Sequence, residues 1–318
     1  MRNIVLLILC LYAAGNALAQ AQNPRVLLET DRGPLLLELD QERAPVTVAN
    51  FLRYVDDARF NDTLVHRVVR NFIVQGGGFR ADGSVIPVYG NINSERNNGL
   101  RNTLGSVAMA LPGNPPNING GSNGWFINTG DNTAMLDANF TVFGKLVFGS
   151  KTLSTINNAP IFQGTEQAIR IPHIQRAVRV AAGQFPILPA HAGSWYDPAN
   201  PGKGFILEVA QASGSEQGPL LILSWYDFHE GKQIWMYGLA PFTWGASSVQ
   251  VPLQISTGGQ FGSAFIPSQI TANTNWGKVT VRFTGCDAGS WEYTSIYGNG
   301  NFPVRSLTLP ADESCVGQ

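Results

Sequence analysis

The chain has 318 residues, a formal net charge of −1 and only 14% charged residues. Phosphate backbones are bound by clustered lysines and arginines, so the absence of a basic run argues against nucleic acid as a partner. The length suits two domains.

The first 19 residues have the pattern of a secretory signal peptide. Arg2 supplies a positive charge, residues 4–14 form an apolar run too short to cross a bilayer, and Ala17-Leu18-Ala19 is a small-residue cleavage site. We expect a mature chain of 318 − 19 = 299 residues that begins at Gln20 and has no later membrane span. The expected location is the periplasm, or alternatively outside the cell. An uncleaved anchor is the other interpretation of this segment.

Removal of the signal would also remove Cys10 and leave Cys286 and Cys315. An even cysteine count in an exported chain favours one disulfide between these two residues. Closing a loop of about 30 residues in this way stabilises a fold by roughly 3 kcal/mol in the chain-entropy model. Two buried free thiols are the alternative.

Residues 24–179 are predicted to form a first domain of short strands separated by Gly, Asn and Pro turns. The turn Asp31-Arg32-Gly33 joins the first two strands, 25–30 and 34–39. Further strands are expected at 63–68, 71–76, 104–110, 124–128 and 140–146. Many short strands of this kind favour a closed barrel.

Two helices are expected beside these strands. Ala44-Pro45 begins the first helix, because proline is tolerated in a first helical turn. The apolar residues that follow recur at i, i+3, i+4 and i+7 and form one stripe: Val48, Phe51, Leu52 and Val55. The segment 151–156 is expected to belong to a second, short helix.

The remainder of the chain has a different character. Residues 180–192 contain two prolines and small residues, which predict a partly extended linker. Residues 193–318 hold six of the seven tryptophans. Alternation of apolar and polar residues in 220–226 and 279–284 predicts a separate all-β domain, a sandwich or a barrel, of about eight strands.

The aromatic residues of this second domain have two interpretations. Trp195, Tyr196, Trp225, Tyr226 and Trp235 are favoured as core residues, because the domain offers no obvious catalytic set. The alternative is a stacking surface for glycans or for unfolded peptide.

The sequence predicts no metal centre, phosphate loop or covalent nucleophile. The four histidines are not at metal-ligand spacing. Gly76-Gly77-Gly78 lacks a following Lys-Ser/Thr pair and is expected instead to let the backbone turn sharply behind Gln75. No Gly-x-Ser-x-Gly motif occurs. We therefore expect no cofactor.

Two clusters in the first domain carry a more specific signal. Val65-His66-Arg67 precedes the stretch 72–79, in which an apolar strand that contains Gln75 ends in the glycine run. The second cluster contains Trp125-Phe126-Ile127-Asn128, Met135-Leu136-Asp137 and residues 140–145. Together they resemble the active-site half of a cyclophilin, the family of peptidyl-prolyl cis-trans isomerases. The resemblance covers about residues 25–178. It implies a cyclophilin-like closed eight-stranded β-barrel with two flanking helices.

This resemblance implies that Arg67 is the catalytic residue, since it occupies the arginine of the family's Phe-His-Arg segment. Rotation about an X-Pro bond has a barrier of about 18–20 kcal/mol because amide resonance must be broken. In the twisted state the nitrogen regains a lone pair, which a guanidinium can meet. An arginine also stays charged at any relevant pH.

The resemblance also implies a set of substrate-binding residues. Gln75 matches the glutamine that binds the substrate backbone and supports the arginine. The proline pocket and its groove are matched by Phe72, Ile73, Ala110, Phe126, Leu136 and Phe140, with residues 117–119 near the groove.

Three positions depart from the family pattern. Asn123-Gly124 stands where the family has a Ser-Gln pair, so a groove glutamine is missing. Met135 stands where many eukaryotic members have tryptophan, and Phe140 where they have the pocket histidine. We expect activity to survive these changes.

The sequence therefore predicts an exported prolyl isomerase, a folding catalyst or chaperone with an appended β-domain. Its expected substrates are X-Pro bonds in unfolded or loop segments of exported proteins. One alternative is a holding protein whose first domain grips peptide without catalysis. Another is that the second domain carries the main function as a glycan-binding module.

Overall fold

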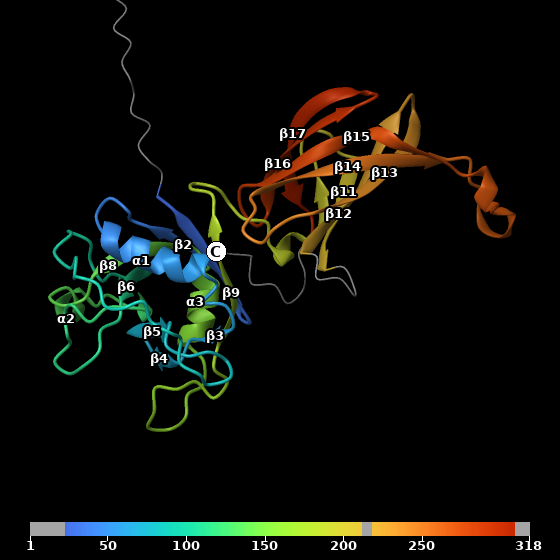
Figure 1. Cartoon of the computed structure of the whole chain (residues 1–318). Coiled ribbons are helices and arrows are strands. Elements are labelled where there is room, and N and C mark those ends of the chain that lie inside the picture. Colours follow the sequence, from blue (N-terminus) through green and yellow to red (C-terminus); the bar gives the residue numbers. More distant parts are fainter. Residues whose placement is uncertain (1–22, 212–217, 309–318) are drawn as a thin grey trace, which may run out of the picture.

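The computed structural model describes residues 23–211 and 218–308, which form two β-domains (Figure 1). The expected signal peptide, Cys10 and Cys315 lie outside the described residues. Within the described ranges, no helix combines the length and the apolarity that a membrane crossing requires.

One sheet of nine antiparallel strands forms the first domain. Its order is β3-β9-β1-β2-β8-β6-β7-β5-β4. The strands are β1 Arg25–Thr30, β2 Gly33–Leu39, β3 Thr63–Leu64, β4 Arg67–Val69, β5 Ile73–Gly76, β6 Ser106–Met109, β7 Trp125–Asn128, β8 Val142–Phe148 and β9 His173–Val180.

The two end strands of this sheet follow one another in the chain. β3 ends at Leu64 and β4 begins at Arg67, and three extended residues span at most about 11 Å. The sheet therefore curls so that its two end strands come close together. It has nine strands, where eight were expected, because the segment 63–69 supplies one strand to each end of the sheet. The single strand expected at 63–68 is two strands with different partners, since β3 pairs with β9 and β4 pairs with β5.

Helix α1 (Pro45–Asp56) covers the inner face of the sheet. It buries the predicted stripe together with Thr47 and Tyr54. The Phe51 ring lies 5.2 Å from the Phe143 ring and 6.4 Å from that of Trp125, which places the helix against strands β8 and β7. Helix α3 (Ser150–Asn157) is the expected second helix, and a short α2 (Thr133–Leu136) precedes β8.

Eight consecutive antiparallel strands close the second domain into a barrel. Its first and last strands pair with each other, Trp195 opposite Ser306 and Tyr196 opposite Arg305. Of the two expected architectures, sandwich and barrel, the second domain therefore has the barrel. The strands are β10 Gly193–Tyr196, β11 Gly204–Gln211, β12 Pro219–His229, β13 Lys232–Pro241, β14 Ser248–Thr257, β15 Thr271–Phe283, β16 Ala288–Ser295 and β17 Gly298–Ser306.

The core interpretation of the aromatic residues holds for Trp195 and Trp225, which are buried inside this barrel. It is wrong for Tyr226 and Trp235, whose side chains are 36% and 47% exposed. These two residues oppose one another on β12 and β13, and side chains alternate between the faces of a strand. The alternative of an aromatic binding surface therefore concerns the outer face of these two strands.

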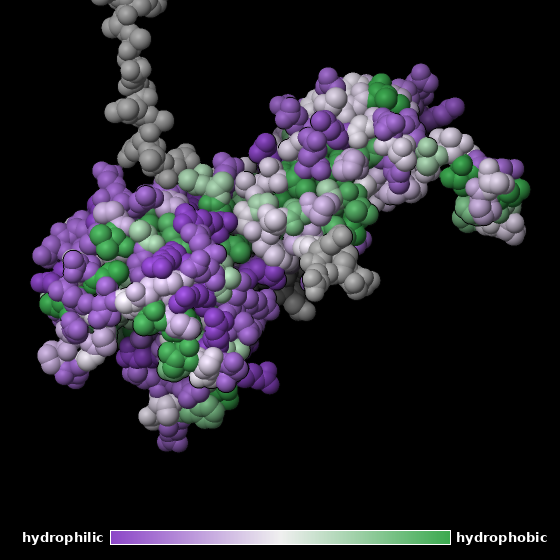
Figure 2. Space-filling view, in the orientation of Figure 1, coloured by the Kyte–Doolittle hydropathy of each residue, from purple (hydrophilic) through white to green (hydrophobic). Residues whose placement is uncertain are grey.

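The β14–β15 hairpin projects well beyond the barrel (Figure 1). Its end, residues 258–270, has hydrophobic residues on its surface (Figure 2). Phe261, Phe265 and Ile266 are all exposed there, Phe261 fully so.

The segment between the domains is packed, in contrast to the partly extended linker that its composition predicts. Ile187 and Leu188 are buried, and Ile187 N–H donates to the Ala246 carbonyl of the second domain at 2.8 Å. On the other side, Arg25 of β1 donates from Nη1 to the Gln184 carbonyl at 2.9 Å. Both domains thus hold this segment.

Strands β1 and β2 are buried on both faces, which explains why their sequences are continuous apolar runs without alternation. One face joins the core under α1. The other face, with Leu27 and Leu36, packs on Leu188 of the connecting segment and on Cys286 of the second domain. The predicted bond from Cys286 to Cys315 stays a prediction, because Cys315 lies outside the described residues.

His191 ends the connecting segment in a short 3-10 helix, Pro189–His191. Its ring is fully buried and stacks on the Phe283 ring, with centroids 3.6 Å apart. Leu188 N–H donates to Nδ1 at 3.1 Å, and Nε2 lies 3.2 Å from the Gly285 carbonyl. Because Nδ1 accepts, the ring is neutral and Nε2 carries the proton.

Candidate active site

A row of directly opposed residues crosses the first sheet on its outer face. Arg67 on β4 opposes Gln75 on β5, which opposes Phe126 on β7, which opposes Ala108 on β6. Opposed residues in antiparallel strands share a face. Their neighbours along the same strands point into the α1-covered core: Val68, Val74, Ile127 and Val107. The period-two pattern of these strands therefore places Arg67, Gln75 and Phe126 side by side.

An apolar cluster lies beside this row. Its buried members are Ile73, Ala108, Phe126, Leu136 and Val142, and its partly buried members are Val69, Phe72, Leu100, Ala110 and Phe140. The Phe126 and Phe140 rings meet edge to face with centroids 5.6 Å apart. The structure thus brings together all six apolar residues predicted for the substrate site, although they come from four separate segments.

Arg67 is held from two sides. Its Nη1 donates to Gln75 Oε1 at 3.2 Å. Its Nε and Nη2 donate to the two carboxylate oxygens of Glu166 at 2.5 and 3.1 Å, a side-on bidentate pair. The hydrogen bonds from Arg67 hold the pKa of the Glu166 carboxyl below its usual range. The arginine side chain is one-third exposed, so the guanidinium is fixed in orientation and still open to a ligand.

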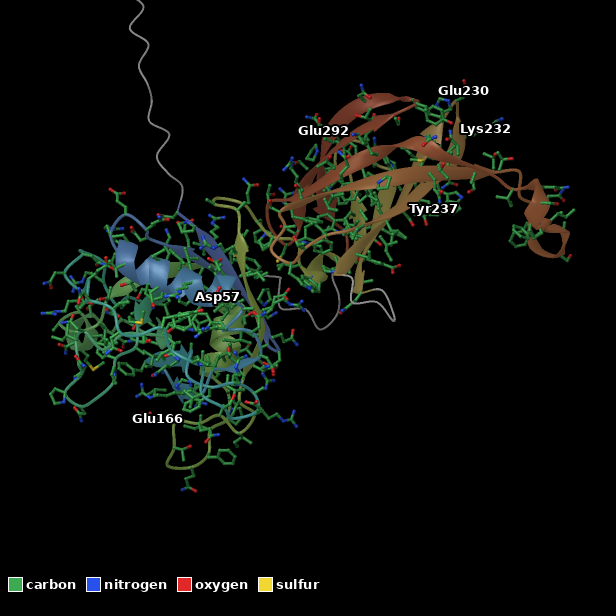
Figure 3. The ribbon with its side chains drawn as sticks, viewed as in Figure 1. Asp57, Glu166, Glu230, Lys232, Tyr237 and Glu292 are labelled. Atoms are coloured by element: carbon green, nitrogen blue, oxygen red, sulfur yellow. The ribbon has the colours of Figure 1, made fainter. Side chains whose placement is uncertain are left out.

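Glu166 is the partner that the sequence did not reveal. It stands 99 residues after Arg67, on the loop that follows α3 (Figure 3). Nothing in that loop repeats at helical or strand spacing, and a single glutamate in such a segment carries no signal of its contacts. Its backbone carbonyl also accepts from Val68 N–H at 2.7 Å, which ties the loop to β4.

A buried polar network supports the pocket from behind. Asn132 Nδ2 donates to the Phe72 carbonyl and to Asn128 Oδ1, both at 2.7 Å. Asn128 Nδ2 donates in turn to Asn102 Oδ1 at 3.1 Å, and Asn102 donates to the Asp137 carboxylate. The network joins the segment that carries Phe72 to the helix that carries Leu136. These asparagines were not predicted, because residue type alone does not show whether an asparagine is buried or exposed.

The glycine run has the role expected for it at Gly77. This residue has a φ of +87°, and a Cβ there would lie 2.1 Å from the Asn123 carbonyl oxygen. The backbone therefore turns sharply just beyond Gln75, close to the segment that contains Asn123-Gly124. Gly124, at the position of the missing groove glutamine, accepts from Ala110 N–H at 3.0 Å.

Two further segments belong to the motifs of the sequence analysis, the loop 117–119 and His66. Residues 117–119 belong to a loop in which Asn117 N–H donates to the Pro112 carbonyl at 2.8 Å. His66 packs against the Phe79 ring with centroids 5.0 Å apart, and burial lowers the pKa of its imidazole. Across residues 23–211 and 218–308, no three His, Cys, Asp or Glu side chains are grouped to hold a metal ion.

Comparison with known proteins places this site in context. The family model described as cyclophilin type peptidyl-prolyl cis-trans isomerase/CLD matches residues 25–176. The chain is 37% identical over 142 residues to a peptidyl-prolyl cis-trans isomerase of Acinetobacter baylyi, covering 43% of this chain and 74% of that relative. It is 36% identical over 157 residues to peptidyl-prolyl cis-trans isomerase A of Dickeya dadantii, covering 48% and 81%.

Among solved structures, the chain is similar to a cyclophilin type peptidyl-prolyl cis-trans isomerase of Cryptosporidium parvum, determined in the presence of the dipeptide Ala-Pro. The match has 26% sequence identity and a TM-score of 0.42, and covers 48% of this chain and 97% of the other.

Proposed function

The chain belongs to the cyclophilin family of peptidyl-prolyl cis-trans isomerases, and from this membership we propose that Arg67 is its catalytic residue and that exported proteins are its substrates. The observation that carries the first proposal is the strand register of Arg67, Gln75 and Phe126 beside one apolar cluster. This arrangement puts a fixed cation next to a surface that suits a prolyl ring.

The chemistry needs no nucleophile and no proton transfer. Uncatalysed rotation takes roughly tens to hundreds of seconds, because the planar amide is stabilised by resonance. As the bond twists, its nitrogen becomes pyramidal and regains a lone pair. A donor that meets this lone pair stabilises the twisted state more than either planar state, which is the condition for catalysis.

The residues around Arg67 fit this role. Phe126, Leu136 and Phe140 would hold the prolyl ring by apolar contact. Gln75 accepts from one N–H of Nη1, so its amide N–H groups stay available for a substrate carbonyl. The guanidinium has five N–H groups, of which three are used by Gln75 and Glu166. Two therefore remain for the twisted amide.

The test is a prolyl-isomerase assay of residues 20–318 and of two arginine variants. We expect Arg67→Ala to lower kcat/KM by more than tenfold, with the urea midpoint of unfolding little changed. Arg43→Ala is the control, because Arg43 also pairs with a carboxylate, that of Asp40, at 2.7 Å, but lies in an exposed turn before α1. A loss of less than tenfold in Arg67→Ala, or an equal loss in both variants, would remove the proposed role of Arg67.

Exported substrates are proposed from the sequence. The support is the signal-like segment 1–19 and the even cysteine count that would follow its removal. The clients would be proline-containing unfolded or loop segments of proteins in the periplasm, or outside the cell if the enzyme is secreted. Fractionation with N-terminal sequencing tests this: a cytoplasmic chain that keeps Met1 would contradict it.

A further inference from the structure

An ionised side chain stands next to the catalytic arginine at a fixed position. Glu166 lies in a small hairpin that is closed by hydrogen bonds from Ile169 N–H to the Pro160 carbonyl at 2.7 Å and from Phe162 N–H to the Gln167 carbonyl at 3.0 Å. A third main-chain bond, from Val68 N–H to the Glu166 carbonyl, ties the hairpin to β4. Backbone and side chain thus both hold Glu166 at the site.

The carboxylate of Glu166 still has bonding capacity directed away from Arg67. Each of its oxygens accepts one hydrogen bond from the guanidinium, and a carboxylate oxygen offers two lone-pair sites. The side chain is 53% exposed, so the outer sites face solvent. The lowered pKa of the carboxyl, caused by Arg67, keeps it ionised at neutral pH.

Arg67 and Glu166 do not present the same face to a ligand. The guanidinium lies in the row with Gln75 and Phe126, where a prolyl bond would sit. Glu166 lies on the opposite edge of that guanidinium, toward the hairpin that contains Phe162 and Ile169. A peptide with its proline over the pocket would meet Arg67 at the proline, and a flanking residue on the side of the hairpin would meet Glu166.

The other carboxylate at the pocket, that of Asp137, is more fully occupied and less exposed. One of its oxygens accepts two hydrogen bonds from Asn102, the other accepts one from Arg101, and its side chain is 25% exposed. Glu166 is therefore the carboxylate with the more accessible acceptor sites.

We propose that Glu166 is a specificity-determining residue that favours prolyl segments with a lysine or arginine flanking the proline and disfavours those with an acidic residue there. This inference rests on the proposed function of the Arg67 site. Exposed charge pairs contribute modestly, so the expected preference for Lys over Glu is about two- to fivefold in kcat/KM. It decreases with added salt, because exposed charges are screened.

The test uses peptides that differ only in the residue before the proline or the residue after it, which is Lys, Ala or Glu. The ratio of kcat/KM for Lys and Glu peptides is measured within each protein, so that changes in overall rate cancel. Glu166→Gln keeps an acceptor for Arg67 and removes the charge. Glu42→Gln removes the same charge from an exposed turn before α1 and serves as control.

In at least one series we expect the Lys/Glu ratio to be two to five in the parent protein and in Glu42→Gln, and near one in Glu166→Gln. A ratio near one in the parent, or an unchanged ratio in Glu166→Gln, overturns the inference. The Ala peptide distinguishes failure of the proposed isomerase function from failure of the proposed role of Glu166. Failure to isomerise it would count against the proposed function, whereas normal turnover of it with no charge preference counts against the role of Glu166 alone.

Discussion

Mild acid is expected to destabilise this protein through His191, the buried residue between the two domains. Its Nδ1 accepts a hydrogen bond from Leu188 and its Nε2–H donates to the Gly285 carbonyl. Protonation would add a hydrogen at Nδ1, break the bond from Leu188 and leave a charge in an apolar cluster. Burial accordingly lowers the pKa of His191 from 6.5 to about 3.

The size of the effect follows from the difference between the folded and unfolded pKa values. Between pH 6.5 and about 3 the unfolded chain binds the proton and the folded chain does not. The contribution of neutral His191 is therefore complete above pH 6.5 and is lost as the pH falls toward 3. For a single group, the loss in unfolding free energy between pH 7 and pH 5 is about 2 kcal/mol.

Urea unfolding at pH 7 and pH 5 measures this loss, and tryptophan fluorescence suits it because six of the seven tryptophans belong to the second domain. His191→Asn is the comparison, since its amide oxygen still accepts from Leu188 N–H but does not titrate. We expect the variant to be less stable at pH 7, having lost the stack on Phe283, yet to lose about 2 kcal/mol less than the parent on acidification. Equal losses in the two proteins would refute this reasoning.

Three further outcomes are expected. Asn132→Ala removes the donor to the buried Asn128 Oδ1 and one of the two donors to the Phe72 carbonyl, which keeps Thr129 N–H. It should therefore lower the unfolding free energy by about 1–3 kcal/mol and also reduce isomerase activity, as urea titration and a peptide assay would show. Gly77→Ala should lower the unfolding free energy by about 2–5 kcal/mol, because the residue has a positive φ and its Cβ would meet the Asn123 carbonyl. Gly83→Ala has a similar φ but open space around it, so its unfolding free energy should fall by only about 1 kcal/mol. Similar losses in urea titrations of the two variants would contradict the contact at Gly77. Reduction by dithiothreitol should lower stability by roughly 3 kcal/mol if Cys286 is disulfide-bonded, and no change would speak for free thiols.

The residues of the candidate site could be predicted from the resemblance of their motifs to one family, and those residues that lie on short alternating strands were also brought together as expected. Once Arg67, Gln75 and Phe126 are placed on strands, period two and antiparallel pairing bring them to one face. Glu166 was not predictable, because its contact with Arg67 spans 99 residues and depends on how one loop folds back. The same applies to Asn132, which is identified by burial and not by residue type.

The elements missed in the fold have local causes. Helix α2 has only four residues, too few for a helical repeat to appear. Strand β9 pairs with β1 through a register shift at Glu29 and Thr30, so its apolar residues do not alternate regularly. In the second barrel, the sequence showed the alternation along each strand. It did not show which face of each strand points inward, and Trp235 was therefore assigned to the core.

The double burial of β1 and β2 has a consequence for the order in which the molecule is made. Leu27 emerges 286 − 27 = 259 residues before Cys286, which covers the same apolar face. A nascent chain that has completed only its first 180 residues would therefore leave the apolar face of β1 and β2, with Leu27 and Leu36, open to water. Such a face invites association with other chains. Synthesis would have to deliver most of the second barrel before the isomerase domain is protected, and a shortened chain that ends after β9 would be a poor substitute for the intact enzyme.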